Sequence, residues 1–349
     1  MWVNCGSRKK FPITYPLLPI PYSPFPITYP LLPILRYDED MATINILGAT
    51  HAYELTPPTA SSSPVLVFIH GCLLSRSYWQ PLIERLTADY QCLIYDLRGF
   101  GDSQTNVDKS QEARSQLDSE LPDADAYELS TSSYTLAAYA ADLGILLKQL
   151  NIDRAWLIGH SLGGSIALWG ALKQPERVLG VICLNAGGGI YLKEEFDRFR
   201  AAGQQLLKRR PRWLCNAPLV DLLFTRAQVA RPLARQWGRQ RVIDFVVANP
   251  EAALRALLDS TTEAEVHRLP QVVSQIEQPV YFIAGAKDTV MEPKYVCHLA
   301  SFHKLFQGCG ENVIEIPGCG HMAMVEQPDA VNIEIRKILA NHQLQELIE

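Results

Sequence analysis

Short apolar runs alternate along most of the chain with stretches whose apolar residues recur at helical spacing. Apolar runs without regular polar interruptions are typical of strands buried on both faces of a parallel sheet. Six of them are evident, at residues 65–69, 92–95, 155–158, 178–184, 280–283 and 313–316. Weaker runs at 43–47 and 52–55 predict an antiparallel hairpin ahead of the sheet. The pattern therefore predicts an α/β fold with a mostly parallel sheet and helices on both faces.

Three stretches between the strands have the spacing of amphipathic helices. They cover residues 78–86, 133–150 and 165–172. In the second stretch Leu136, Leu143 and Leu150 fall on one face, and Ser132 or Ser133 can cap the start of the helix. We expect these helices to cover the sheet.

Two segments interrupt the alternation. Residues 104–130 are polar and net acidic with little periodicity, which predicts a surface loop. Residues 187–275 have a helical pattern without a convincing strand, and arginines crowd their centre. We expect them to form a helical cap, or lid, over the carboxyl edge of the sheet, where open α/β sheets bind ligands. The core then comprises residues 41–186 and 276–349.

The first 40 residues do not share this pattern. Residues 11–20 recur unchanged at 25–34, and prolines break both copies. The prolines exclude a helix or a central strand, and the stretch fits neither a bilayer span nor a signal peptide. One interpretation is a proline-rich docking arm or a membrane-adherent tail. We favour the other, that residues 1–40 are a duplicated extension, disordered or not native, ahead of a true start at Met41.

The composition is that of a soluble globular protein, with 48% hydrophobic and 20% charged residues in 349. The net charge of −5 gives no reason to expect nucleic acid as a partner. The eight cysteines are scattered without a Cys-x-x-Cys pair, which argues against zinc ribbons and dithiol redox sites. We expect reduced, mostly buried thiols in a cytoplasmic protein.

The strongest chemical signal is the pentapeptide Gly159-His160-Ser161-Leu162-Gly163, which joins an apolar run to a helical stretch. A serine between two glycines at a strand-to-helix junction is the nucleophile-elbow pattern. The glycines are needed because this strained turn brings strand and helix too close together for a side chain. The hydroxyl is then exposed at the carboxyl end of the strand, so Ser161 is the candidate nucleophile.

A serine hydroxyl becomes a good nucleophile when an imidazole accepts its proton and a carboxylate orients that imidazole. His321 lies directly behind the last predicted strand, and Asp288 follows the preceding one. The order Ser161, Asp288, His321 is the chain order that accompanies an elbow of this kind. We therefore assign these three residues as a candidate catalytic triad.

Further motifs agree with the triad: His70-Gly71-Cys72, the segment from Asp96 to Ser103 (Asp-Leu-Arg-Gly-Phe-Gly-Asp-Ser), and Gly320-His321. In this order and spacing they resemble the α/β-hydrolase family, in the branch with a His-Gly loop and a helical cap. The resemblance covers residue 42 to the end. It implies a mostly parallel eight-stranded sheet with an inserted helical lid. It also implies an oxyanion hole formed by the backbone N–H groups of Cys72 and Leu162.

Other polar residues have structural interpretations. His70 is expected to brace the oxyanion loop, and His160 to pack or hydrogen-bond beneath the elbow. Asp96 and Asp102 are expected to stabilise a glycine-rich turn. Nothing near Cys72 in sequence would lower its pKa, so its thiol is not expected to be catalytic. The remaining histidines have no metal-ligand spacing and no phosphate-binding motif is evident, so we expect neither metal nor cofactor.

The nucleophile narrows the chemistry. In this family, haloalkane dehalogenases and epoxide hydrolases carry aspartate at the elbow, so Ser161 argues against both. Serine implies attack on a carbonyl carbon and an acyl-enzyme that water hydrolyses, with His321 acting first as base and then as acid. We expect a small-molecule acyl substrate, with carboxylic ester hydrolysis as the leading reaction and thioester, lactone or carbon–carbon bond cleavage close behind.

The arginine-rich lid leaves alternatives open. We interpret it as a solvated helical face, but one or two inward guanidiniums would bind a substrate carboxylate. That would resemble the menaquinone- and phylloquinone-pathway synthase, a lyase-like relative with the same triad. A basic lid could also adhere to an anionic membrane. Cofactor-free perhydrolases and non-catalytic receptors share the fold as well. If Asp288 is not the acid, Glu194 and Glu195 are the next candidates, and the oligomeric state is left open.

Overall fold

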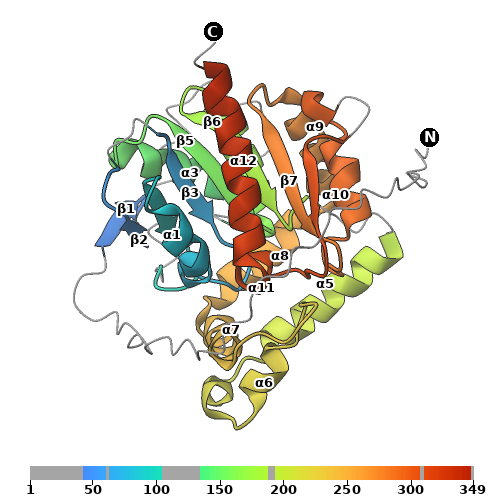
Figure 1. Ribbon diagram of the computed structural model, residues 1–349. Helices are drawn as coiled ribbons and strands as arrows, with labels where there is room; N and C mark the ends of the chain where they lie inside the picture. The colour runs from blue at the N-terminus through green and yellow to red at the C-terminus, as the bar shows by residue number, and fades with distance from the viewer. Residues whose placement is uncertain (1–41, 60–62, 104–133, 188–192, 307–309, 347–349) are drawn as a thin grey trace, which may run out of the picture. The chain divides into compact units, whose positions relative to one another are not determined.

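The computed structural model describes residues 42–59, 63–103, 134–187, 193–306 and 310–346 (Figure 1). The proposed extension at 1–40, the loop expected at 104–130 and the two serines Ser132 and Ser133 lie outside these ranges. Within the described ranges, no helix is both long and apolar enough to cross a bilayer.

Eight strands form one sheet in the order β1-β2-β4-β3-β5-β6-β7-β8. They are β1 (Ala42–Ile46), β2 (Ala49–Leu55), β3 (Val65–Ile69), β4 (Cys92–Tyr95), β5 (Ala155–His160), β6 (Val178–Leu184), β7 (Val280–Gly285) and β8 (Val313–Ile316). The hairpin β1–β2 and the β2–β4 pair are antiparallel, and all other pairs are parallel. The predicted eight-stranded, mostly parallel sheet is confirmed, with β5 and β7 each two residues longer than expected and β2 beginning three residues earlier.

Strands β3, β4 and β6 are apolar throughout because both faces of the sheet are covered there. In β3, Leu66 and Phe68 join one buried cluster while Val67 and Ile69 join the other. Successive side chains of a strand point to opposite faces, so both sets of positions must be apolar here. This explains why the strands appear in the sequence as continuous apolar runs.

Helices cover both faces of the sheet (Figure 1). One face carries α1 (Gln80–Leu86), which follows the short η1 (Arg76–Trp79), together with α11 (Ala323–Glu326) and α12 (Pro328–Glu346). The other carries α3 (Leu136–Gln149), α4 (Leu162–Lys173), α9 (Glu263–Gln275) and α10 (Pro293–Ala300), with the turn η3 (Lys304–Phe306) after it. This arrangement confirms the predicted layers.

Two of the predicted helix starts were wrong. Helix α3 begins at Leu136, and its N-cap is Thr135, whose hydroxyl accepts the N–H of Ala138 at 3.1 Å, in place of Ser132 or Ser133. Helix α4 begins at Leu162, three residues before the predicted start at residue 165. The elbow leads into the helix without a spacer, and its two glycines hid that start from a search for apolar periodicity.

Between β6 and β7 the chain forms helices, and residues 193–275 contain no strand. These helices are α5 (Lys193–Lys208), η2 (Arg212–Asn216), α6 (Val220–Phe224), α7 (Arg235–Val247), α8 (Pro250–Ser260) and α9. Helix α9 packs against α4 and α10 in the layer over the sheet, whereas η2 and α6 both pack against α7 beyond the sheet (Figure 1). We call residues 193–260 the helical insertion. The predicted limits of the cap, 187–275, stay a prediction.

Candidate active site

Ser161 occupies a strained turn between β5 and α4. Its backbone has φ 53° and ψ −118°, a region that residues other than glycine rarely adopt. A Cβ on Gly159 would lie 2.1 Å from the carbonyl oxygen of Gly163, and one on Gly163 would lie 2.2 Å from that of Ile69. Both glycines of the pentapeptide are therefore required by close backbone approach, as the sequence predicted.

His321 and Asp288 meet at the carboxyl edge of the sheet. Nδ1 of His321 donates to Oδ2 of Asp288 at 2.8 Å, and both side chains are buried. The loops after β7 and β8 bring them together because these strands are parallel neighbours. The predicted partnership of these two residues is present in the structure. It fixes the proton of the imidazole on Nδ1 and leaves the lone pair on Nε2.

Asp288 is held as a carboxylate by several donors. Its Oδ1 accepts the N–H groups of Val290 at 2.8 Å and Met291 at 2.9 Å, and its Oδ2 accepts the side-chain amide of Asn185 at 3.0 Å. Burial by itself would raise the pKa of Asp288. The hydrogen bonds from His321 and from the backbone outweigh burial and lower it. The group is thus a stable anion that can orient and stabilise the imidazole.

Asn185 is a site residue that sequence reasoning missed. It directly follows β6, is fully buried and has φ 48°. Its Nδ2 donates both to Asp288 and to the carbonyl oxygen of Gly320, at 3.0 Å each, and so ties the acid to the histidine loop. The available signal was an asparagine at a strand end, since asparagine tolerates a left-handed backbone better than most residues.

His160 contacts His321 through a hydrogen bond and through its ring. Its Nε2 lies 2.8 Å from the carbonyl oxygen of His321, and the two rings are 4.8 Å apart between centroids. A carbonyl only accepts, so Nε2 carries the proton. Burial, followed by the charge of His321, lowers the pKa of His160 to about 3. The ring is therefore neutral and structural, which matches the interpretation from sequence.

The loop at His70-Gly71-Cys72 lies beside the elbow. A Cβ on Gly71 would sit 3.2 Å from the Cβ of Ser161. The fully buried His70 donates from Nδ1 to the carbonyl oxygen of Gly71 at 2.8 Å and accepts the N–H of Leu97 at Nε2 at 3.0 Å. Burial lowers the pKa of His70, so the ring stays neutral and braces the loop as predicted. Burial raises the pKa of the Cys72 thiol to about 12, which agrees with a non-catalytic thiol.

Asp96 and Asp102 are structural, as expected from the sequence. Asp96 is fully buried and accepts the N–H of Arg76 at 2.6 Å and that of Asp102 at 2.8 Å. The guanidinium of Arg76 bonds to both carboxylates. Together these contacts fix the turn after β4 against the start of η1.

The helical insertion contacts the histidine loop directly. The backbone N–H of His321 donates to the carbonyl oxygen of Gln228 at 2.9 Å, and that of Ala230 donates to Glu326 at 2.8 Å. The carboxylate of Glu326 also accepts the N–H groups of Gly320 and Met322, at 3.0 Å each. These contacts join segments far apart in sequence, and no motif marks them.

Several arginines of the insertion donate to protein carbonyl groups. Arg241 is buried and donates to the carbonyl oxygens of Phe224 and Ala227. Arg210 donates to those of Leu207, Phe245 and Ala248. Arg210 also lies close enough to Cys72 for its charge to act on the thiol. Of these arginines it is the one that links the insertion electrostatically to the predicted oxyanion loop.

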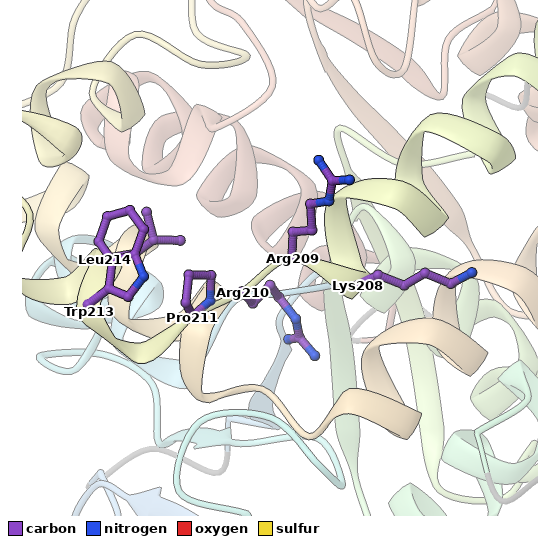
Figure 2. A pocket seen from close by; sticks show the side chains of 6 residues that line it. All are labelled: Lys208, Arg209, Arg210, Pro211, Trp213 and Leu214. Carbon is purple, nitrogen blue, oxygen red and sulfur yellow. The ribbon is translucent and has the colours of Figure 1, made fainter.

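A surface hollow of about 610 Å³ lies on the insertion (Figure 2). It is lined by Lys208, Arg209, Arg210, Pro211, Trp213 and Leu214. Figure 2 shows the side chains of Arg209 and Arg210 extending away from each other. The side chains of Glu194 and Glu195, the alternative acids, lie outside the described part of the chain.

Comparisons with known proteins agree with this architecture. A 2-succinyl-6-hydroxy-2,4-cyclohexadiene-1-carboxylate synthase of Serratia proteamaculans is 26% identical over 283 residues, which are 80% of this chain and 94% of that protein. An uncharacterised protein of Mycobacterium tuberculosis is 27% identical over 292 residues, 80% of this chain and 76% of the other. The structure of a thermophilic esterase from Thermogutta terrifontis aligns with a TM-score of 0.62 at 22% identity, over 86% of this chain and 98% of that one.

The family model for the alpha/beta hydrolase fold matches residues 64–328, which include the elbow, the helical insertion and both partner loops. The sheet order and the loops at its carboxyl edge agree with that match. The chain therefore belongs to the α/β-hydrolase family and is an α/β-fold hydrolase.

Proposed function

We propose that this protein hydrolyses carboxylic esters or related acyl compounds through an acyl-enzyme on Ser161. The observation that carries the proposal is the 2.8 Å bond from His321 Nδ1 to a fixed Asp288 carboxylate, next to an elbow serine with φ 53°. Because His321 carries its proton on Nδ1, its Nε2 is free to take the proton of the Ser161 hydroxyl.

Each proton in the proposed reaction has an assigned place. His321 Nε2 removes the Ser161 proton as Oγ attacks the carbonyl carbon, and Asp288 stabilises the resulting imidazolium. The imidazolium then protonates the leaving alcohol as the ester carbon–oxygen bond breaks. A water molecule, deprotonated by the same Nε2, attacks the acyl-enzyme and releases the acid, and Ser161 regains its proton.

The oxyanion hole is proposed to use the backbone N–H groups of Cys72 and Leu162. Leu162 opens α4, and the first N–H of a helix has no carbonyl partner within that helix. Cys72 follows Gly71, which packs against the elbow. Both donors belong to the main chain, so the protonated thiol of Cys72 takes no part in the chemistry.

The experiment is a burst assay with p-nitrophenyl acetate and butyrate on the wild type, Ser161→Ala and the control Ser165→Ala, which alters a serine one turn into α4. We expect a nitrophenol burst from the wild type and the control, and none from Ser161→Ala. Equal turnover by Ser161→Ala, or no burst from the folded wild type, would overturn the acyl-enzyme.

A second candidate is a reaction on an acidic substrate, such as that named for the Serratia relative. Arg210 favours it, because this guanidinium lies near the proposed oxyanion loop. If it binds a substrate carboxylate, Arg210→Gln should raise KM for esters with a carboxylate and leave KM for neutral esters unchanged. Arg209→Gln is the matched control, since its side chain extends the other way (Figure 2). An equal change for both ester types would count against the acidic substrate.

A further inference from the structure

An apolar surface of the helical insertion is open to solvent. Trp213 is 65% exposed, Leu219 62% and Leu223 70%. Leu222 is also exposed, and the basic side chains of Arg209 and Arg212 are nearby in sequence and exposed. We call these six residues the insertion tip. Large apolar side chains gathered in one segment mark a contact surface, whereas isolated ones are ordinary.

The fold of α6 explains why its leucines are exposed. Leu219 is the N-cap of α6, and Leu222 and Leu223 follow within the helix, three and four residues further on, so all three lie within about one turn of each other. The opposite side of α6 carries Phe224, whose ring lies 5.9 Å from that of Phe245 in α7. One side of α6 therefore packs against α7, and a second apolar side faces solvent.

The surroundings of the tip are strongly basic. Residues 206–241 contain nine lysines and arginines and a single acid, Asp221, although the whole chain has a net charge of −5. That acid pairs with Arg235 at 2.5 Å. Three of the nine, Lys208, Arg209 and Arg210, line the hollow beside Trp213 (Figure 2). The occupant of this surface must therefore accept both leucine side chains and several positive charges.

We propose that the insertion tip docks on an anionic lipid bilayer. A bilayer surface offers an apolar layer for the leucines, an interfacial zone that suits tryptophan, and negative headgroups for the arginines. A second copy of the chain fits less well, because pairing two tips would bring two basic segments together. This surface is independent of Ser161 and goes beyond the proposed hydrolysis. Since the same insertion contacts the His321 loop, docking would hold that loop close to lipid.

The test is sedimentation of the full chain with vesicles of phosphatidylcholine, with and without phosphatidylglycerol. We expect binding to the anionic vesicles that weakens at high salt. Leu219→Ser/Leu223→Ser and Arg209→Gln/Arg212→Gln should each weaken it at least about tenfold. Phe302→Ser/Ile333→Ser, which alters exposed apolar residues outside the insertion, and Lys148→Gln/Lys173→Gln should stay within about twofold of the wild type.

Thermal unfolding and circular dichroism establish that each variant is folded before it is compared. Absence of binding to the anionic vesicles, or equal binding by folded tip variants and controls, would overturn the proposal. Self-association that the leucine substitutions abolish, without vesicle binding, would assign the tip to a second copy. Binding to an acidic peptide but not to vesicles would assign it to a protein partner. Either result would replace the bilayer.

Discussion

At the scale of single residues, the site depends on both carboxylate oxygens of Asp288 acting as hydrogen-bond acceptors. All of the bonds it receives come from N–H donors: His321, Asn185 and the backbone of the following turn. An amide at this position would point its own N–H₂ group at one of these donors. The side chain therefore has to be a carboxylate, and not merely a polar group of that size.

Asp288→Asn should lower ester turnover roughly a thousandfold or more without unfolding the protein. The amide would turn its N–H₂ toward Nδ1 of His321 and favour the tautomer with the proton on Nε2, which cannot accept the serine proton. The measurement is kcat for p-nitrophenyl butyrate, with the exposed Asp153→Asn as control. Turnover within tenfold of the wild type would transfer the role to another acid.

The sequence was sufficient to identify Ser161, Asp288 and His321 as candidates because each follows a strand and carries a recognisable chemical group. Their roles remain a proposal. It was not sufficient for Asn185 or Gln228. Asn185 acts through one amide placed by the end of β6, and Gln228 through a backbone carbonyl that any residue could supply. Contacts made by main-chain atoms do not depend on the residue type, so the sequence cannot reveal them.

At the scale of elements, Glu326 is the point where the insertion and the histidine loop are held together. Three backbone N–H groups share its carboxylate: those of Ala230, Gly320 and Met322. Two of them flank His321. The carboxylate in α11 therefore sets the path of the loop on both sides of the proposed base.

Glu326→Gln should reduce kcat about tenfold and change KM much less. The glutamine amide can accept from some of these N–H groups, but its N–H₂ must face another, so the loop shifts. The readout is the split between kcat and KM for a neutral ester, with the exposed Glu251→Gln at the start of α8 as control. An unchanged kcat, or a loss confined to KM, would contradict this positioning role.

A second element contact predicts a dependence on pH. Asp244 of α7 is buried and accepts from Ser75 at 3.1 Å and Gln240 at 3.0 Å. Burial raises its pKa from 3.8 to about 7, and the charge of Asp96 adds to the effect. The folded state thus holds a proton that the unfolded state releases near pH 4. Stability is fully present below that pH and decreases as the pH rises to about 7.

Asp244→Asn should remove this dependence, because the amide stays neutral. Relative to the wild type, the variant should gain about 1 to 3 kcal/mol of unfolding free energy between pH 5 and pH 8. Urea unfolding at both pH values measures the change, with the exposed Asp153→Asn as control. A difference between variant and wild type that stays constant across pH would show that Asp244 is ionised in the folded protein.

At the scale of the whole molecule, the fold was more predictable than the insertion. Strands buried on both faces must be apolar at every position, so each one is visible in the sequence, and their parallel order follows from the helices between them. The insertion has no such constraint. Whether Arg210 and Arg241 meet solvent, substrate or carbonyl groups depends on where helix ends lie in space. Arg210 and Arg241 form internal bonds, whereas Arg209 and Arg212 lie exposed, as expected for the solvated face that composition favoured.

The compact unit Met41–Glu349 leads to the last prediction, that a chain starting at Met41 keeps the fold and activity of the full chain. Strand β1 begins at Ala42, whose partner is Tyr53 in β2, so the sheet pairing of the described residues starts directly after Met41. Deleting residues 1–40 should leave the thermal midpoint within about 2 °C and ester turnover within about twofold. Deletion through Ile46 is the contrasting variant, because it removes β1 and exposes the edge of β2, and it should lower the midpoint clearly. A large loss already on removing residues 1–40 would show that they stabilise the hydrolase unit.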